Sequence, residues 1–270
     1  MKKLLSLLLL LLVSIGYSFG QNKEIRNVGT FSKISFRVPG KLVLRQGSPQ
    51  KVEIEGDKET LSKIETEVKG DRLVIGNEDR WNWGWRDNDR VMVYITVKDI
   101  TGVSVSGSGD LITEGKVTTE KLDLNVSGSG SLLIEASVSG DLKADVSGSG
   151  RIEVKGACRS FDSEISGSGK VSATLTVAEQ VEVSISGSGK LEASGTAKEI
   201  KTEISGSGKV YASTLEVEVC RVRISGSGDV EINVKKELDA TISGSGTVSY
   251  KGNPSHVNGN SSGSGKLRKM

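Results

Sequence analysis

Trp81, Trp83 and Trp85 are the only tryptophans of the chain, and they lie within five positions of one another. The residues around them, from Asn77 to Asp89, are otherwise mostly polar or charged, which is typical of a hairpin tip that cannot bury three indoles. Indole rings stack on sugars and anchor protein partners. We therefore predict that these three residues bind a surface glycan or an envelope protein. The alternative is that the loop folds over its neighbours.

The chain has few other side chains that could carry out catalysis or bind a metal ion. His256 is the only histidine, which excludes a histidine-based triad and a multi-histidine metal site. We predict no catalytic residue, no metal site and no cofactor. A basic leader carrying Lys2 and Lys3 accounts for the formal charge of +2, and the rest of the chain carries 34 basic and 34 acidic residues. This neutrality argues against nucleic acid as a partner.

The strongest signal is a repeat. The tetrapeptide Ser-Gly-Ser-Gly occurs nine times, with its first serine at positions 106, 127, 147, 166, 186, 205, 225, 243 and 262. The residue before each of the first eight is Val or Ile, and apolar residues recur five positions before and five positions after the motif's first serine. The positions between these columns are mostly polar, for example Glu182 and Ser184 on either side of Val183. Such alternation predicts strands with one buried face.

A period of about 20 residues with aligned columns predicts a β-solenoid, in which equivalent residues of successive coils stack ~4.8 Å apart. The motif glycines either face the interior or form a corner that requires positive φ. The motif serines either form outward hydroxyl ladders or bond to neighbouring backbone groups at a bend.

The same stacking places Asp145 beside Glu164, flanked by Asn125 and Ser184. Polysaccharide hydrolases and lyases need clustered carboxylates, so a polysaccharide-active enzyme is an alternative. Two stacked carboxylates on a solvated sheet are more typical of an ordinary surface, and we predict that the protein is not an enzyme. Cys158, interpreted as a turn residue, and Cys220, interpreted as a core residue, lie about three coils apart. That separation, roughly 14 Å, is too long for a disulfide.

The chain divides into three parts. Residues 1–20 have the basic, apolar and small-residue regions of a signal peptide, so we expect export, and no later run is long enough to form a transmembrane segment. Residues 21–100 form a β-rich N-terminal cap with a helix predicted over 59–68, and residues 101–270 form the repeat. The last coil of the repeat departs from the pattern, because Ser261 stands in a column that is otherwise apolar. Charged residues in this coil are expected to keep an exposed strand edge from pairing with other chains. Strands are predicted over 31–38, 41–46, 51–55, 72–75 and 91–97.

The leader, the opening Phe31-Ser32-Lys33-Ile34 segment, residues 65–75 and the Ser-Gly-Ser-Gly units resemble the putative auto-transporter adhesin head GIN domain family, which is common in Bacteroidetes. The resemblance covers about residues 27–250. It implies a right-handed, pectin-lyase-like parallel β-helix, a cell-envelope location and a role in adhesion, and it supplies no catalytic residues. We therefore expect an adhesin or surface-interaction rod in the periplasm or at the cell surface. An envelope-stress or regulatory accessory protein is the alternative, and ice binding by the serine ladders is less favoured.

Overall fold

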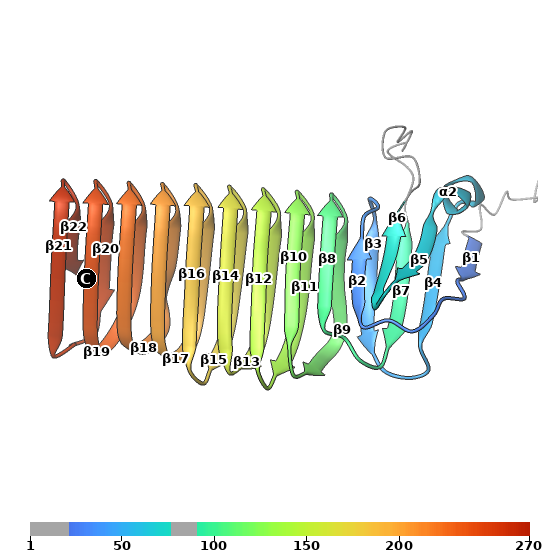
Figure 1. Cartoon of the computed structure of the whole chain (residues 1–270), viewed down its shortest axis with the longest axis horizontal. Helices are drawn as coiled ribbons and strands as arrows, with labels where there is room; N and C mark the ends of the chain where they lie inside the picture. The colour runs from blue at the N-terminus through green and yellow to red at the C-terminus, as the bar shows by residue number, and fades with distance from the viewer. Residues whose placement is uncertain (1–21, 77–90) are drawn as a thin grey trace, which may run out of the picture.

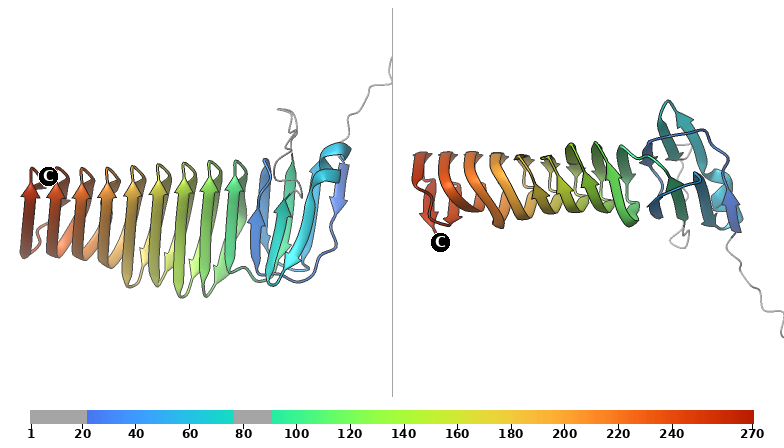
Figure 2. Two further views of the ribbon diagram at one scale, coloured as in Figure 1. Left: turned by 45° about the horizontal axis from the view of Figure 1, so that its top comes forward. Right: turned by 90° about the horizontal axis from the view of Figure 1, so that it is seen from below.

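The computed structural model describes residues 22–76 and 91–270, most of which lie in the strands of one long β-solenoid (Figure 1). Each coil of the repeat contributes two strands that face each other across a thin core. The rod therefore has two parallel sheets joined at two edges, and the flattened coils follow one another along its axis (Figure 2). The predicted all-β solenoid with coils of about 20 residues is confirmed.

The strands that lead into the Ser-Gly-Ser-Gly motifs form one sheet, called here the motif sheet. It consists of β8 (Gly102–Gly107), β10 (Leu122–Gly128), β12 (Asp141–Gly148), β14 (Ser160–Gly167), β16 (Gln180–Gly187), the second halves of β17 (Lys190–Gly206), β18 (Lys209–Gly226) and β19 (Asp229–Gly244), and β21 (His256–Gly263). The return sheet consists of β9 (Asp110–Thr119), β11 (Ser131–Val138), β13 (Arg151–Cys158), β15 (Lys170–Val177), the first halves of β17, β18 and β19, β20 (Thr247–Lys251) and β22 (Lys266–Lys269). The motifs join the two sheets at the motif edge, and the other edge is the return edge.

Successive coils are in register along the whole motif sheet, so that the first serine of every motif lies beside the first serine of the next motif. The spacing between motifs nevertheless varies from 18 to 21 residues. The return sheet absorbs part of this variation, because its register shifts at Leu133/Glu135, Glu192/Ser194 and Ala212/Glu216. The motif sheet consequently keeps an unbroken alignment while the return sheet takes up insertions.

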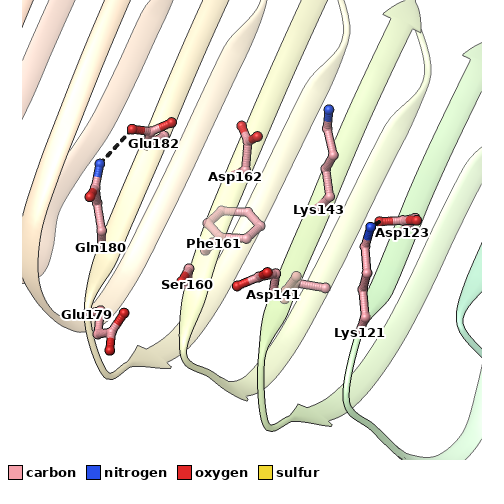
Figure 3. Close-up of a pocket in the computed structure, with 11 residues that line it drawn as sticks. Lys121, Asp123, Asp141, Lys143, Ser160, Phe161, Asp162, Glu179, Gln180 and Glu182 are labelled. Carbon is pink, nitrogen blue, oxygen red and sulfur yellow. Dashed lines mark hydrogen bonds and ion pairs between the residues drawn. The ribbon is translucent and has the colours of Figure 1, made fainter.

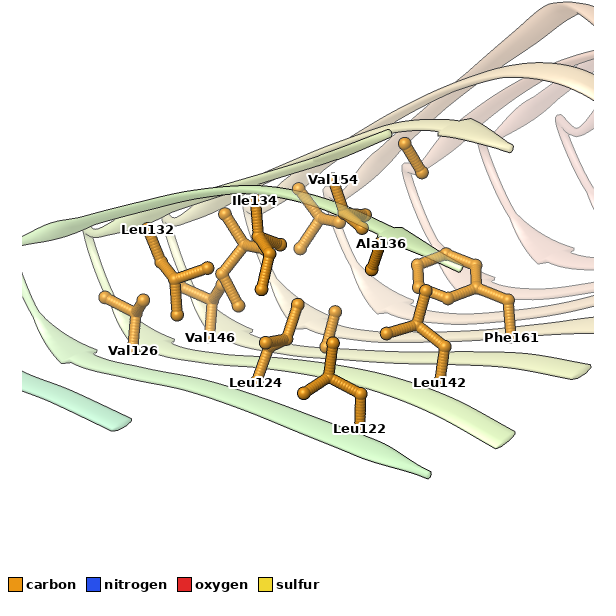
Figure 4. Close-up of a cluster of buried hydrophobic side chains, with 14 of the residues drawn as sticks. Leu122, Leu124, Val126, Leu132, Ile134, Ala136, Leu142, Val146, Val154 and Phe161 are labelled. Carbon is orange, nitrogen blue, oxygen red and sulfur yellow. The ribbon is translucent and has the colours of Figure 1, made fainter. Parts of the chain in front are cut away.

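The core is a thin apolar layer between the two sheets. Leu122, Leu124 and Val126 of β10 pack against Leu132 and Ile134 of β11, and each is at most 3% exposed (Figure 4). Burial of each such side chain contributes about 1.5–3 kcal/mol. The predicted assignment of inward and outward positions is confirmed by these columns.

The two glycines of each motif have different geometric roles. The first has positive φ, +108° in Gly148, and a Cβ there would lie 2.8 Å from the carbonyl oxygen of Gly128 in the preceding coil. The second faces the interior, where a Cβ on Gly228 would lie 2.7 Å from Cγ2 of Ile204. Both alternatives predicted for the motif therefore apply, one to each glycine.

The solenoid continues into the segment that precedes the repeat. β2 (Lys33–Phe36) and β3 (Lys41–Gln46) pair in parallel with β8 and β9 and form a coil without the motif. β6 (Arg72–Gly76) and β7 (Met92–Val97) pair in parallel with β2 and β3 and form a further coil. These strands are therefore continuous with the rod as well as lying at its end.

Antiparallel strands cover this end. β4 (Lys51–Gly56) pairs with β7, β1 (Asn22–Ile25) with β4, and β5 (Glu65–Lys69) with β6. The helix α2 (Lys58–Lys63) begins at Asp57, whose carboxylate accepts a hydrogen bond from the Thr60 backbone N–H. The prediction of a helix over 59–68 is wrong beyond residue 63. Residues Glu65–Lys69 instead form hydrogen bonds to β6 through their backbone N–H and C=O groups. They thereby cover an edge of β6 that would otherwise be open to pairing with another strand.

Candidate functional site

A depression of about 400 Å³ lies on the motif sheet, near the return edge (Figure 3). Four successive strands, β10, β12, β14 and β16, contribute to it. Its lining residues are Lys121, Asp123, Asp141, Leu142, Lys143, Ser160, Phe161, Asp162, Glu179, Gln180 and Glu182. The depression therefore needs four coils, each of which provides two or three outward side chains, while β12 and β14 also provide its floor.

The floor of the depression is apolar and its rim is charged. Leu142 and Phe161 stand side by side in the core column and are 1% and 2% exposed, so the phenyl ring is not a stacking platform. Around them, the lining carries five carboxylates and two lysines. A net negative rim over a closed apolar floor favours ligands that donate hydrogen bonds, such as hydroxyl or ammonium groups.

Some rim carboxylates already have partners in the protein. Arg159 Nη2 donates to Asp141 Oδ1 at 2.8 Å, which lowers the pKa of the Asp141 carboxyl. Gln180 Nε2 donates to Glu182 at 2.6 Å, and Lys121 Nζ lies 3.6 Å from Asp123. The Asp162 carboxylate has no hydrogen bond or ion pair with the residues that the structure describes, and it points outward between Lys143 and Glu182 in the stack.

The predicted carboxylate pair lies one row further along the same strands. Asp145 and Glu164 are register partners, flanked by Asn125 and Ser184. Burial raises the pKa of the Asp145 carboxyl, and the neighbouring Glu164 raises it further, although Lys143 Nζ at 3.5 Å opposes both effects. Its Oδ1 is buried without a hydrogen-bond partner among the described residues.

The serines of the motif edge are available to solvent. The strip consists of two serines per coil, and no hydroxyl of these serines hydrogen-bonds to another described residue. The backbone closes the corner instead, because the N–H of the second serine donates to the carbonyl of the first glycine in the preceding coil, as Ser168 does to Gly148 at 2.9 Å. Of the two interpretations, outward hydroxyl ladders fit the structure.

Trp81, Trp83 and Trp85 lie outside the described residues, so their predicted binding role stays a prediction. The structure does describe the residues on either side of the segment that carries these tryptophans. Gly76 ends β6 and Val91 precedes β7, at the same position in the coil that the motif occupies elsewhere. The described flanks of the tryptophan-bearing segment therefore lie at the motif edge.

Both cysteines are free and buried. Cys220 occupies the core column and is 1% exposed, as predicted. The interpretation of Cys158 as a turn residue is wrong, because it is the last residue of β13, is 5% exposed and stacks on Val177. Burial raises the pKa of the Cys158 thiol to about 11 and raises that of Cys220 as well. Neither thiol is activated as a nucleophile.

Within residues 22–76 and 91–270, no three His, Cys, Asp or Glu side chains are grouped to hold a metal ion. No helix of the described chain is long and apolar enough to cross a membrane.

The model of a known family matches residues 30–192 and 166–254, which together span most of the chain. The chain belongs to this family, described as "Putative auto-transporter adhesin, head GIN domain". The resemblance noted from the motifs is thereby confirmed. No curated protein sequence matches the chain.

Solved structures share the fold at low sequence identity. A putative adhesin from Parabacteroides distasonis is 22% identical, with a TM-score of 0.71, over 93% of this chain and 98% of its own. A putative adhesin from Parabacteroides merdae is also 22% identical, with a TM-score of 0.70, over 94% and 97%. A putative lipid binding protein from Parabacteroides distasonis is 21% identical, with a TM-score of 0.69, over 94% and 98%. At this identity the likeness establishes the fold of the chain.

Proposed function

We propose that this protein is an exported, non-enzymatic rod of the cell envelope that makes adhesive contacts along its surface. The observation that carries the proposal is the in-register motif sheet, which presents straight rows of outward side chains over its whole length. Such an array suits a ligand that is itself extended and repetitive, because each coil offers an equivalent contact ~4.8 Å further along. Family membership supports an adhesin-like role.

Two surfaces are candidates for the contact. The acidic depression offers hydrogen-bond acceptors around Asp162. The motif edge offers free serine hydroxyls, and the described flanks of the segment that carries Trp81, Trp83 and Trp85 lie at the same edge. We favour a polyhydroxylated ligand, since carboxylates and hydroxyls both bond to sugar hydroxyls and indoles stack on sugar rings.

The chemistry of the core and surface supports a non-enzymatic role. The thiols are buried with raised pKa values. Asp145, a carboxyl whose pKa burial raises, has a lysine beside it rather than a partner oriented for nucleophilic attack. We infer that the carboxylates bind and do not react.

The test is binding of the purified protein to an array of glycans and isolated envelope fractions, repeated with two variants. In one variant Trp81, Trp83 and Trp85 are replaced by Ala, and in the other Asp162 and Glu182 are replaced by Asn and Gln. We expect the parent to bind a glycan and one variant to lose at least about tenfold in affinity, equivalent to ~1.4 kcal/mol. Unchanged melting temperatures show that the variants fold.

Each surface makes a different prediction about salt. Contacts of a ligand's ammonium group to the charged depression weaken as ionic strength rises, whereas hydroxyl hydrogen bonds and indole stacking do not. If the parent binds no glycan and no envelope component, the adhesive role is wrong and an envelope-stress or regulatory accessory role becomes the better explanation.

A further inference from the structure

A row of four cations, called here the cationic stripe, runs along the return sheet beside the motif edge. It consists of Arg151, Lys170, Lys190 and Lys209, and each of these residues comes directly after a Ser-Gly-Ser-Gly motif. The next residue of each strand is buried in the core, so the four side chains lie on the outer face. Adjacent members are register partners in successive coils, which places them ~4.8 Å apart over roughly 14 Å of the rod.

The stripe is bounded on both sides by residues that are not basic. The equivalent positions of the two preceding coils hold Asp110 and Ser131, and that of the following coil holds Asp229. The motif is present before all three of these residues as well. The fold therefore does not require a cation at this position, and the cations are confined to four coils in the middle of the repeat.

A run of stacked like charges costs stability, because side chains directly opposite one another in a sheet repel when their charges have the same sign. In the paired strands of the described repeat, no other outward row carries more than two like charges in succession. Elsewhere a stacked cation can have a carboxylate as its register partner, as Arg223 has Glu203 at 3.5 Å. A row that stability does not favour, with one sign of charge, is typical of a surface that attracts a ligand of the opposite sign.

Two carboxylates offset part of the charge of the stripe. Glu192 lies 2.8 Å from both Lys170 and Lys190, one lysine at each carboxylate oxygen, and these contacts lower the pKa of its carboxyl. Asp229 lies 3.8 Å from Lys209. The guanidinium of Arg151 has no ion pair or hydrogen bond with the residues that the structure describes. Four cations thus contact two carboxylates, and the stripe keeps a positive surplus.

Free hydroxyl groups lie next to the stripe. The second serines of the same four motifs stand two residues before the four cations, at Ser149, Ser168, Ser188 and Ser207. All four serines are exposed, and their hydroxyls have no hydrogen bond to another described residue. A serine hydroxyl can bond to a sugar hydroxyl or to an anionic oxygen, and a cation adjacent to it strengthens the attraction to the anion. Each of the four coils therefore offers one cation and one free hydroxyl at the same edge.

We propose that the cationic stripe and these serines bind an anionic polysaccharide, whose sugars carry carboxylate or sulfate groups along the chain. The inference rests on the proposed adhesive function and adds the charge of the ligand that the motif edge takes. A polymer with repeated anionic groups meets the cations in succession, whereas a single anion meets one or two of them. A sugar chain fits better than an acidic peptide or a nucleic acid, because its hydroxyls can bond to the serines between the anionic groups. The depression on the other sheet has a net negative lining and should not accept the same ligand.

The probes are polygalacturonate and dextran sulfate, with methyl-esterified polygalacturonate and dextran as the uncharged forms of the same chains. Binding to the purified protein is followed by biolayer interferometry. We expect at least one charged polymer to bind, its uncharged form to bind at least about tenfold more weakly, and the binding to weaken as ionic strength rises. An eight-sugar fragment of the bound polymer should bind at least about tenfold more tightly than a two-sugar fragment, because only the longer fragment reaches all four cations.

Two variants locate the contact. In the first, the four cations of the stripe are replaced by Gln, and affinity for the charged polymer should fall at least about tenfold. The matched control also replaces one arginine and three lysines by Gln, at Lys201, Arg223, Lys235 and Lys236 on other outward positions, and should bind within about twofold of the parent. All eight side chains are exposed or partly exposed. Unchanged melting temperatures show that both variants fold.

Equal losses in the two variants would overturn the proposal in favour of nonspecific attraction between the rod and any polyanion. A fifteen-nucleotide oligothymidylate that binds as tightly as the charged polysaccharide would overturn the assignment to a sugar chain. Equal binding of charged and uncharged polymers would overturn the charge of the ligand and leave glycan binding by the rod intact. If neither charged polymer binds, the inference is wrong, and the neutral glycans of the array described above decide the adhesive function separately.

Discussion

Replacing Thr202 by Val should stabilise the rod. Thr202 points into the core of the motif sheet, is 1% exposed and has a hydroxyl with no hydrogen-bond partner among the described residues. Its neighbours in the column are Val183 and Val222. A valine therefore matches both the shape of Thr202 and the surroundings of its side chain.

The expected gain follows from the cost of the unpaired hydroxyl. Burying a polar group without a partner costs ~1–3 kcal/mol, and the added methyl contributes further apolar burial. We expect the free energy of unfolding to rise by about 1–2 kcal/mol. For a chain of this size that corresponds to a rise in melting temperature of roughly 2–8 °C.

The measurement is urea unfolding followed by far-ultraviolet circular dichroism. Thr241→Val is the matched control, because the same chemical change is made at an exposed position, where the effect should stay within about 0.5 kcal/mol. Ser163→Ala provides a second test in the same column, since its buried hydroxyl is also unpaired among the described residues. A loss of stability of ~1 kcal/mol or more in Thr202→Val would show that the hydroxyl makes a favourable bond, and the reasoning would be refuted.

Three further predictions use neighbouring features of the rod. Val183→Asp should cost several kcal/mol by placing a charge in the core, whereas Ser184→Asp on the outer face should be nearly silent, and equal melting temperatures would contradict the orientation of the strand. Thiol titration without reductant should find two sulfhydryls, those of Cys158 and Cys220, only after unfolding, and finding none in the monomer would contradict their free state. Asp145→Asn should raise stability at neutral pH, because burial raises the native pKa and disfavours the charged form. That gain should shrink as acid protonates the native carboxyl, and a gain independent of pH would point to packing.

The sequence contains enough to predict the repeat coils because their determinants are local. An alternation of period 2 that returns every 18 to 21 residues specifies both the strand and its inward face, as at Val183 and Ser184. The sequence predicts two roles for the motif glycines, but it does not show which glycine of the motif has which role. That assignment depends on close approach to the preceding coil, as for Gly228 against Ile204.

The N-terminal coils could not be predicted in the same way. In space, β2 and β3 lie between the coil of β8 and β9 and the coil of β6 and β7, so the order of coils differs from the order of the sequence. Their corner is Arg37-Val38-Pro39-Gly40, which lacks the motif. The strand over Glu65–Lys69 was missed because it is set by pairing with β6 and not by its own composition.

The candidate binding site is also a property of several coils together. The outward row Asp123, Lys143, Asp162 and Glu182 is visible in the sequence, but the depression appears only when Leu142 and Phe161 form a floor beneath it. Each coil of a solenoid contacts mainly its neighbours. Outward residues can therefore change in one coil without disturbing the core of another.

This independence explains how one repeat can carry a varied surface. The inward columns and motif glycines are constrained by contact with the adjacent coil, while an outward residue such as Asp162 meets only solvent and the side chains stacked beside it. Some charges that face the next coil have a partner there, as Arg223 has Glu203. The outer face of the rod can thus vary from coil to coil while the in-register core stays the same.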